Sequence, residues 1–276
     1  MNRRYFLFSA AALALAGCTA QPSEAQAPRF QPTRFSVQVR GTGPDVILIP
    51  GLTSGPEVWR ATVAALPGYR YHLVHVAGFA GAPVRGNRDG SVVASLAVEI
   101  ARYIAANRLD RPALIGHSMG GTAALMVAAR QPNLVGRVMV VDMLPQAAGL
   151  FGSSAAQLGP LANALRDVAG TTQGQRLFES LVQNFGPLNG PRSDSRVVAR
   201  AMHELATTDL TPELARIRAP LTVVYAPQNT EAPRVYATSY ANARGARFVR
   251  VAGSGHMIML DQPQRFQAAV RDFLRR

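Results

Sequence analysis

Gly116-His117-Ser118-Met119-Gly120 is the stretch that decides the fold of this chain. It matches the pattern G-x-S-x-G, in which a serine occupies a sharp turn between a strand and a helix and glycines relieve the crowding around it. The flanking residues suit that turn, because an apolar run at 112–115 precedes it and a helix-forming run at 121–130 follows it. The start of a helix beneath the serine favours negative charge there. We therefore predict that Ser118 is a nucleophile at the edge of a sheet.

Outward from this turn, the chain alternates between short apolar strands and helices. This alternation predicts an α/β fold with a mostly parallel, twisted sheet and helices on both of its faces. The continuous apolar run 45–49 is typical of a buried parallel strand, whereas the alternating run 35–40 predicts an early antiparallel strand. Further strands are expected at 71–76, 114–115, 137–141, 221–225 and 247–251, and helices at 57–66, 91–107 and 264–274.

Residues 143–219 interrupt this rhythm, since they contain helical segments at 155–168, 175–184 and 195–206 but no convincing strand. An insertion at the carboxyl ends of parallel strands lies over the crevice in which ligands bind. We therefore predict a helical cap at 143–219 over a core formed by 34–142 and 220–276. The alternative is a long excursion without a role in substrate choice. Apolar residues of this segment suggest a pocket for an apolar group, although each fits the core of the cap as well: Leu144, Leu150, Phe151, Leu158, Leu161, Phe178, Leu181 and Phe185.

The first 18 residues have the pattern of an export signal. Arg3-Arg4 is followed by an apolar run at 5–16, which is too short to span a bilayer. The segment 2–7 resembles the twin-arginine export motif, and Leu15-Ala16-Gly17-Cys18 resembles a bacterial lipobox, in which the cysteine is acylated. The alternative is a plain secretory signal with an incidental cysteine.

The single cysteine of the chain, Cys18, stands at the lipobox position. We predict that it is lipidated and that membrane lipid is therefore a partner of the protein. Residues 19–33 are rich in Ala, Gln and Pro and predict a flexible tether. The resulting protein would face the periplasm, and Thr19 after the cysteine favours the outer membrane over the inner one.

The formal net charge is +13, and all of the basic residues behind it are arginines, because the chain contains no lysine. The arginines are scattered, with no run longer than two and no interleaved aromatic residues. This pattern is typical of a solvated surface, and it argues against nucleic-acid binding. A loose attraction to anionic lipid headgroups is compatible with it.

Taken together, these motifs resemble those of the α/β-hydrolase superfamily over residues 35–276. The resemblance rests on Pro50-Gly51-Leu52, on the motif at 116–121 and on Gly253-Ser254-Gly255-His256, which occur in the order typical of the family. Within the superfamily the chain resembles the capped bacterial esterase and haloperoxidase-like branch. The resemblance implies an α/β-hydrolase fold with a helical cap insertion.

The resemblance also assigns expected roles. Ser118 would be the nucleophile and His256 the base that takes its proton. The backbone N–H groups of Leu52 and Met119 would form the oxyanion hole. His117 is expected to point away from Ser118 and to pack in the turn. The remaining histidines suit the base less well, because two lie in a strand and one lies in the cap: His72, His75 and His203.

The acid is where the sequence departs from the family pattern. Most members place an Asp soon after the strand that follows the cap, but residues 226–231 contain none. We predict that Asp142, at the end of the strand 137–141, orients His256. Glu231 and the absence of any acid remain alternatives, and Asp142 could instead be a structural carboxylate. The choice matters, because loss of this carboxylate can reduce turnover by about 10⁴.

No metal site, dinucleotide fingerprint or Walker loop is visible in the sequence, so we expect no cofactor. The predicted function is hydrolysis of a small ester with an apolar part, through an acyl-enzyme. Amide, lactone, C–C bond and perhydrolysis chemistry are alternatives on the same fold. A binding lipoprotein with a relic triad is a further alternative, and the missing Asp after Tyr225 is the feature that supports it.

Overall fold

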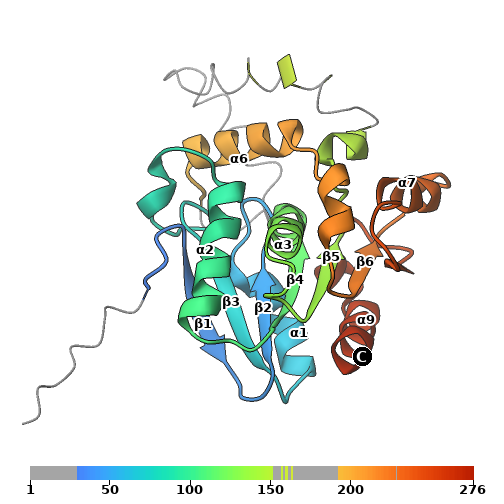
Figure 1. The fold of residues 1–276 in the computed structure, drawn as a ribbon, viewed down its shortest axis with the longest axis horizontal. Coiled ribbons are helices and arrows are strands. Elements are labelled where there is room, and N and C mark those ends of the chain that lie inside the picture. The colour runs from blue at the N-terminus through green and yellow to red at the C-terminus, as the bar shows by residue number, and fades with distance from the viewer. Residues whose placement is uncertain (1–29, 152–156, 158, 161–162, 164–191, 228) are drawn as a thin grey trace, which may run out of the picture.

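The structure is a computed structural model, and it describes residues 30–151, 157, 159–160, 163, 192–227 and 229–276 (Figure 1). The predicted export signal, Cys18 and residues 19–29 of the predicted tether lie outside this part of the chain, as do most of the expected helices at 155–168 and 175–184. Within the described ranges, no helix combines the length and the apolar character needed to cross a membrane.

Seven strands form a single sheet in the order β1-β3-β2-β4-β5-β6-β7. β1 lies at one edge and runs antiparallel to β3, and every other neighbouring pair is parallel. This arrangement confirms the predicted α/β-hydrolase fold class. The strands are β1 (Phe35–Arg40), β2 (Asp45–Ile49), β3 (Arg70–Val76), β4 (Ala113–His117), β5 (Arg137–Val141), β6 (Leu221–Tyr225) and β7 (Arg247–Arg250).

Helices cover both faces of the sheet. α2 and α3 pack side by side on one face, while α1 and α9 meet on the other, and α6 crosses above α2 and α3 (Figure 1). The helices are α1 (Arg60–Ala65), α2 (Val93–Ala106), α3 (Met119–Arg130), α6 (Ser195–Thr207), α7 (Ala232–Ser239), α8 (Ile258–Asp261) and α9 (Pro263–Arg275), with 3-10 turns at Pro56–Trp59, Arg85–Arg88, Ala147–Phe151 and Thr211–Arg216.

The central strands are apolar on both sides because each side meets a helical layer. Along β2, Ile47 and Ile49 pack with the α2–α3 layer, while Val46 and Leu48 pack with the α1–α9 layer. Trp59 belongs to the second layer, where its ring lies 6.1 Å from that of Phe266. This two-sided burial explains why the run 45–49 is continuously apolar rather than alternating.

Where the structure describes the expected elements, their boundaries differ from the observed ones by a few residues at most. The largest change is at 57–66, where the chain forms a 3-10 turn before α1 instead of one helix. The expected helix at 195–206 is α6. Leu144, one of the apolar residues of the expected cap, is buried in the core.

The chain already packs on the domain at residues 30–33, the last part of the predicted tether. Phe30 contacts the main core. The Thr33 amide and hydroxyl donate to the Glu99 carboxylate of α2 at 2.7 and 2.6 Å, and Arg85 donates to the Pro32 carbonyl at 2.9 Å.

One carboxylate of α6 fixes this helix to the start of α2. The two oxygens of Glu204 accept hydrogen bonds from the amides of Val92, Val93 and Ala94 at 2.7–2.8 Å. These amides have no helical partner of their own, because the first N–H groups of a helix point out of its end. Glu204 therefore acts as an N-terminal cap supplied from another part of the chain.

Candidate active site

Ser118 occupies the turn between β4 and α3 with φ 51° and ψ −122°. A non-glycine residue rarely adopts a positive φ, and such strain is typical of functional turns. The turn is possible because its neighbours lack side chains. A Cβ atom at Gly116 would collide with the backbone of Gly120, and one at Gly120 would collide with the carbonyl of Ile49. The glycines of the motif are therefore required by the close approach of β2, β4 and α3.

The loop after β2 lies directly against this turn. A Cβ atom at Gly51 would lie 2.8 Å from Nδ1 of His117 and 3.1 Å from Cβ of Ser118. Leu52 follows Gly51, and Met119 is the first residue of α3, so its amide has no acceptor within the helix. The structure thus brings the Leu52 loop and the start of α3 together beside Ser118. The role of these two amides as an oxyanion hole stays a prediction.

His256 and Asp142 meet in a direct hydrogen bond. Nδ1 of His256, in the loop between β7 and α8, lies 2.8 Å from Oδ2 of Asp142. Asp142 follows β5 with φ 50°, and its amide donates to the Val224 carbonyl at 2.8 Å. The side chain of Asp142 is 6% exposed, whereas that of His256 is 48% exposed. A buried carboxylate therefore holds one nitrogen of a ring that is about half exposed.

The alternative acid, Glu231, is placed differently. Its side chain is 67% exposed, and its carboxylate lies 3.9 Å from Arg234 on the surface of α7. Of the two candidate carboxylates, the structure brings Asp142 to His256 and leaves Glu231 in solvent.

Two further donors hold the other oxygen of Asp142. The amide of Ala226 donates to Oδ1 at 2.9 Å, and the Tyr236 hydroxyl donates to it at 3.1 Å. The Tyr236 ring is buried and stacks on Tyr225, with ring centroids 4.5 Å apart. Burial, together with the charge of Asp142, raises the pKa of Tyr236 far above its ordinary value. Its hydroxyl is therefore a permanent donor to the carboxylate.

The side chain of His117 makes a specific contact with the His256 loop in addition to packing in the turn. Its Nε2 lies 2.9 Å from the backbone oxygen of His256, and the two imidazole centroids are 4.6 Å apart. Since a carbonyl only accepts, the proton of this ring is on Nε2. Burial, with a further effect from His256, lowers the pKa of His117 from 6.5 to about 3. A neutral imidazole therefore links the Gly51 loop to the His256 loop.

The described contacts contain no direct hydrogen bond between the Ser118 hydroxyl and the His256 ring. In free enzymes this bond is often long, and it tightens only when substrate binds. Ser118 and His256 are nevertheless connected through His117, which is adjacent to one of them in the chain and bonded to the other.

The model of a known family matches residues 46–269, which span most of the chain and all of the residues above. That family is described as the alpha/beta hydrolase family. This chain belongs to it.

Among curated relatives, this α/β hydrolase is 26% identical to the pimeloyl-[acyl-carrier protein] methyl ester esterase of Aromatoleum aromaticum, over 84% of this chain and 98% of the relative. Among solved structures, an esterase from Exiguobacterium antarcticum matches with a TM-score of 0.66 and 20% identity, covering 88% of this chain and 96% of that one. The enol-lactonase from Burkholderia xenovorans LB400 matches with a TM-score of 0.65, the same identity and the same coverage. The two structural matches show the fold.

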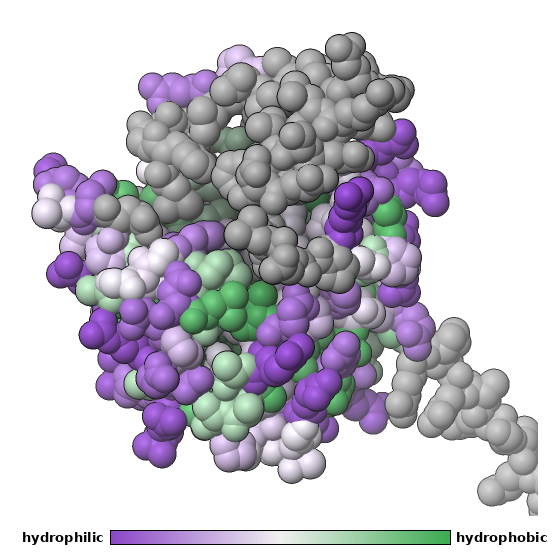
Figure 2. Space-filling view, turned by 180° about the vertical axis from the view of Figure 1, so that it is seen from behind, coloured by the Kyte–Doolittle hydropathy of each residue, from purple (hydrophilic) through white to green (hydrophobic). Residues whose placement is uncertain are grey.

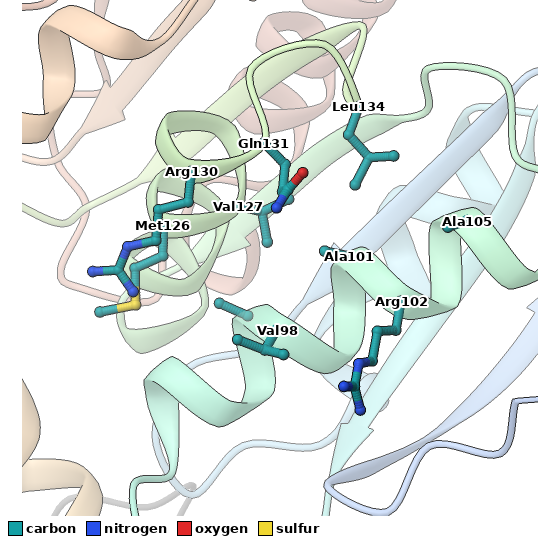
Figure 3. Close-up of a pocket in the computed structure, with 10 residues that line it drawn as sticks. Val98, Ala101, Arg102, Ala105, Met126, Val127, Arg130, Gln131 and Leu134 are labelled. Atoms are coloured by element: carbon teal, nitrogen blue, oxygen red, sulfur yellow. The ribbon is translucent and has the colours of Figure 1, made fainter.

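The described part of this α/β hydrolase holds no cluster of three or more metal-ligating side chains. It has a cavity of about 320 Å³ in a groove between α2 and α3, and neither Asp142 nor His256 is among the lining residues (Figure 3). Small and apolar side chains line most of this groove, and arginines stand at its sides: Ala97, Val98, Ala101, Arg102, Ala105, Met126, Val127, Arg130, Gln131 and Leu134. The lining contains no nucleophile, carboxylate or histidine.

Sequence reasoning did not find Tyr236 or the contact of His117 with His256. Tyr236 is 94 residues from Asp142 in the chain, and a tyrosine on one side of a short helix is an ordinary core residue by pattern. The G-x-S-x-G motif marks His117 as a residue of the turn, but it does not reveal that the ring bonds to the backbone of His256.

Proposed function

We propose that this α/β hydrolase is a serine esterase that cleaves a carboxylic ester with an apolar part through an acyl-enzyme. The observation that carries the proposal is the 2.8 Å hydrogen bond between His256 and the buried Asp142, beside a serine held in the strained turn. The similarity to a curated methyl ester esterase over nearly its whole length supports the same reaction class.

In the proposed reaction, the Ser118 oxygen attacks the ester carbonyl carbon while His256 takes the hydroxyl proton. The amides of Leu52 and Met119 stabilise the negative oxygen of the tetrahedral intermediate. Collapse of this intermediate breaks the bond to the alcohol, which leaves with the proton from His256. A water molecule then attacks the acyl carbon while His256 takes its proton, and His256 gives this proton to the Ser118 oxygen as the acyl–serine bond breaks and the acid is released. Asp142 orients the imidazole and stabilises its charged form.

The position of Asp142 favours an active enzyme over a binding protein with an inactive triad. The absence of Asp at 226–231 was the ground for a binding protein with an incomplete triad. A carboxylate at the end of β5 already contacts His256, so that ground is weak. Lactone cleavage is the same acyl transfer to a serine, so the substrate panel should contain lactones as well as esters.

Hydrolysis of p-nitrophenyl esters of short and medium chain length by the full chain, purified in detergent, tests this proposal. We expect Ser118→Ala to abolish turnover and Asp142→Asn to reduce it by about 10⁴, because the imidazole loses its orienting charge. Glu231→Gln is the matched control and should retain the activity of the parent. Equal losses in Asp142→Asn and Glu231→Gln would refute the assignment of the acid. A parent that neither hydrolyses the panel nor reacts with a fluorophosphonate would refute the esterase.

We further propose that the protein is exported and held on the periplasmic side of a membrane through an acylated Cys18, with the outer membrane favoured. The lipobox-like sequence at 15–18 and the single cysteine support this proposal.

A further inference from the structure

We infer that Tyr236 is a positioning residue of this site, whose hydroxyl sets the orientation of Asp142 and thereby of His256. The inference rests on the proposed function, since it concerns how the proposed base is held. It adds a residue from α7 that neither the sequence motifs nor the family resemblance include.

Three groups surround the Asp142 carboxylate within hydrogen-bond distance. Asp142 binds His256 through Oδ2 only, and a single bond leaves a carboxylate free to rotate about its own axis. The amide of Ala226 and the hydroxyl of Tyr236 both bind Oδ1. With one oxygen fixed by two donors, the plane of the carboxylate is set and Oδ2 points at the imidazole.

Both donors to Oδ1 come from the part of the chain that follows β6. Ala226 directly follows β6, and Tyr236 lies on α7, the next helix. This is the segment in which the family resemblance leads one to expect the acid. Here the acid stands at the end of the neighbouring strand β5, and the segment after β6 supplies hydrogen-bond donors to it instead.

The Tyr236 side chain is held in place by its surroundings. Tyr236 is buried, and its ring stacks on Tyr225 with an angle of 26° between the planes. Because a carboxylate only accepts hydrogen bonds, the direction of this one is fixed from Tyr236 to Asp142. Removing the hydroxyl would leave Oδ1 with one donor fewer, so the carboxylate could rotate, Oδ2 would lose its alignment with the imidazole, and the protonated imidazole would be stabilised less.

Tyr240 provides a matched control one turn further along. It is also buried, and its hydroxyl also donates a hydrogen bond, at 2.8 Å to the carbonyl of Met143, the residue after Asp142. Tyr236→Phe and Tyr240→Phe therefore each remove one buried hydroxyl from the same region. A purely structural role predicts equal effects of the two changes.

The experiment compares both variants with the parent as full chains in detergent, using a short-chain p-nitrophenyl ester over a range of pH. We expect Tyr236→Phe to lower kcat by about two- to tenfold, the range that one hydrogen bond contributes, with little change in KM. The acidic limb of its kcat/KM profile should move to lower pH by a few tenths of a unit, because the misaligned carboxylate stabilises the protonated imidazole less. Tyr240→Phe should keep both kcat and the position of this limb.

A second readout does not depend on turnover. The proton between His256 and Asp142 should give a far-downfield proton NMR signal, identified by its loss in Asp142→Asn. We expect this signal to shift or broaden in Tyr236→Phe and to stay unchanged in Tyr240→Phe. Identical behaviour of the two variants in both readouts would overturn the inference. Failure of the proposed function would appear separately, as a parent without Ser118-dependent hydrolysis, and the NMR comparison would then decide the role of Tyr236.

Discussion

At the scale of single residues, a buried neutral histidine stands between the two loops that the proposed chemistry needs. His117 touches Gly51 on one side and donates to the backbone of His256 on the other. Its Nδ1 is buried without a hydrogen-bond partner among the described residues. A buried histidine of this kind makes the stability of the protein depend on pH, because the folded state disfavours its protonated form.

We therefore predict that the protein becomes less stable as the pH falls from about 6.5 towards about 3. In that range the unfolded chain protonates His117, whose folded pKa is about 3, so the unfolded state binds more protons. The free energy of unfolding should consequently rise with pH by up to about 1.4 kcal/mol per pH unit from this residue alone. Denaturant unfolding measured across the range checks this.

His117→Gln separates this contribution from that of the carboxylates. The glutamine amide can still donate to the His256 carbonyl, but it does not titrate. The slope of stability against pH should therefore be smaller in the variant than in the parent. Parallel slopes would show that the folded protein binds a proton at His117 as readily as the unfolded chain does.

At the scale of elements, the link between α6 and α2 is the contact with the clearest energetic consequence. Glu204 brings a negative charge to three free amides at the start of α2, where the helix dipole favours it. We predict that Glu204→Ala lowers stability by about 1–2 kcal/mol, as the loss of an N-terminal cap does. Amide hydrogen exchange should become faster at Val92, Val93 and Ala94.

Glu213 offers the control for this change. Its carboxylate pairs with Arg130 of α3 at 2.9 Å near the surface, where an ion pair contributes at most about 1 kcal/mol. Glu213→Ala should therefore cost less than Glu204→Ala and leave exchange at the start of α2 unchanged. Equal costs would mean that the Glu204 bonds add nothing beyond an ordinary surface pair.

The elements also show what sequence patterns can and cannot reveal. The strands and α2 could be predicted because burial on two faces, or on one helical face, leaves a local pattern. The Ser118 turn could be predicted because its glycines are adjacent in sequence. The contacts of Glu204 with α2 and of Tyr236 with Asp142 could not, because they join residues about a hundred positions apart. A single polar residue on a helix carries no mark of its distant partner.

At the scale of the whole molecule, the charge and the start of the chain bear on where the protein works. Hydrophilic residues are spread over the face seen in Figure 2 rather than gathered in one patch, in keeping with scattered arginines and a net charge of +13. Such a surface suits weak attraction to anionic headgroups, and a stable attachment needs the proposed lipid.

We predict that cells expressing the full chain incorporate a labelled fatty acid into the protein and that Cys18→Ala abolishes this labelling. The parent should sediment with membranes, preferentially those of the outer membrane. Ser118→Ala serves as the control, because it should be labelled like the parent while lacking hydrolysis. Equal labelling of the parent and Cys18→Ala would rule out acylation at this position.

The contacts around residues 32–34 also have a mechanical meaning. A pull on the chain ahead of the domain enters at Phe30 and first meets the bonds from Thr33 and Arg34 to Glu99 and from Arg85 to Pro32. These bonds join the entering chain to α2 and to the loop before it, so the force is spread into the body of the domain before it reaches β1. In this way the bonds protect β1 from tension on the preceding chain. Tension on the chain ahead of residue 30 would therefore leave the geometry around Ser118, Asp142 and His256 undisturbed.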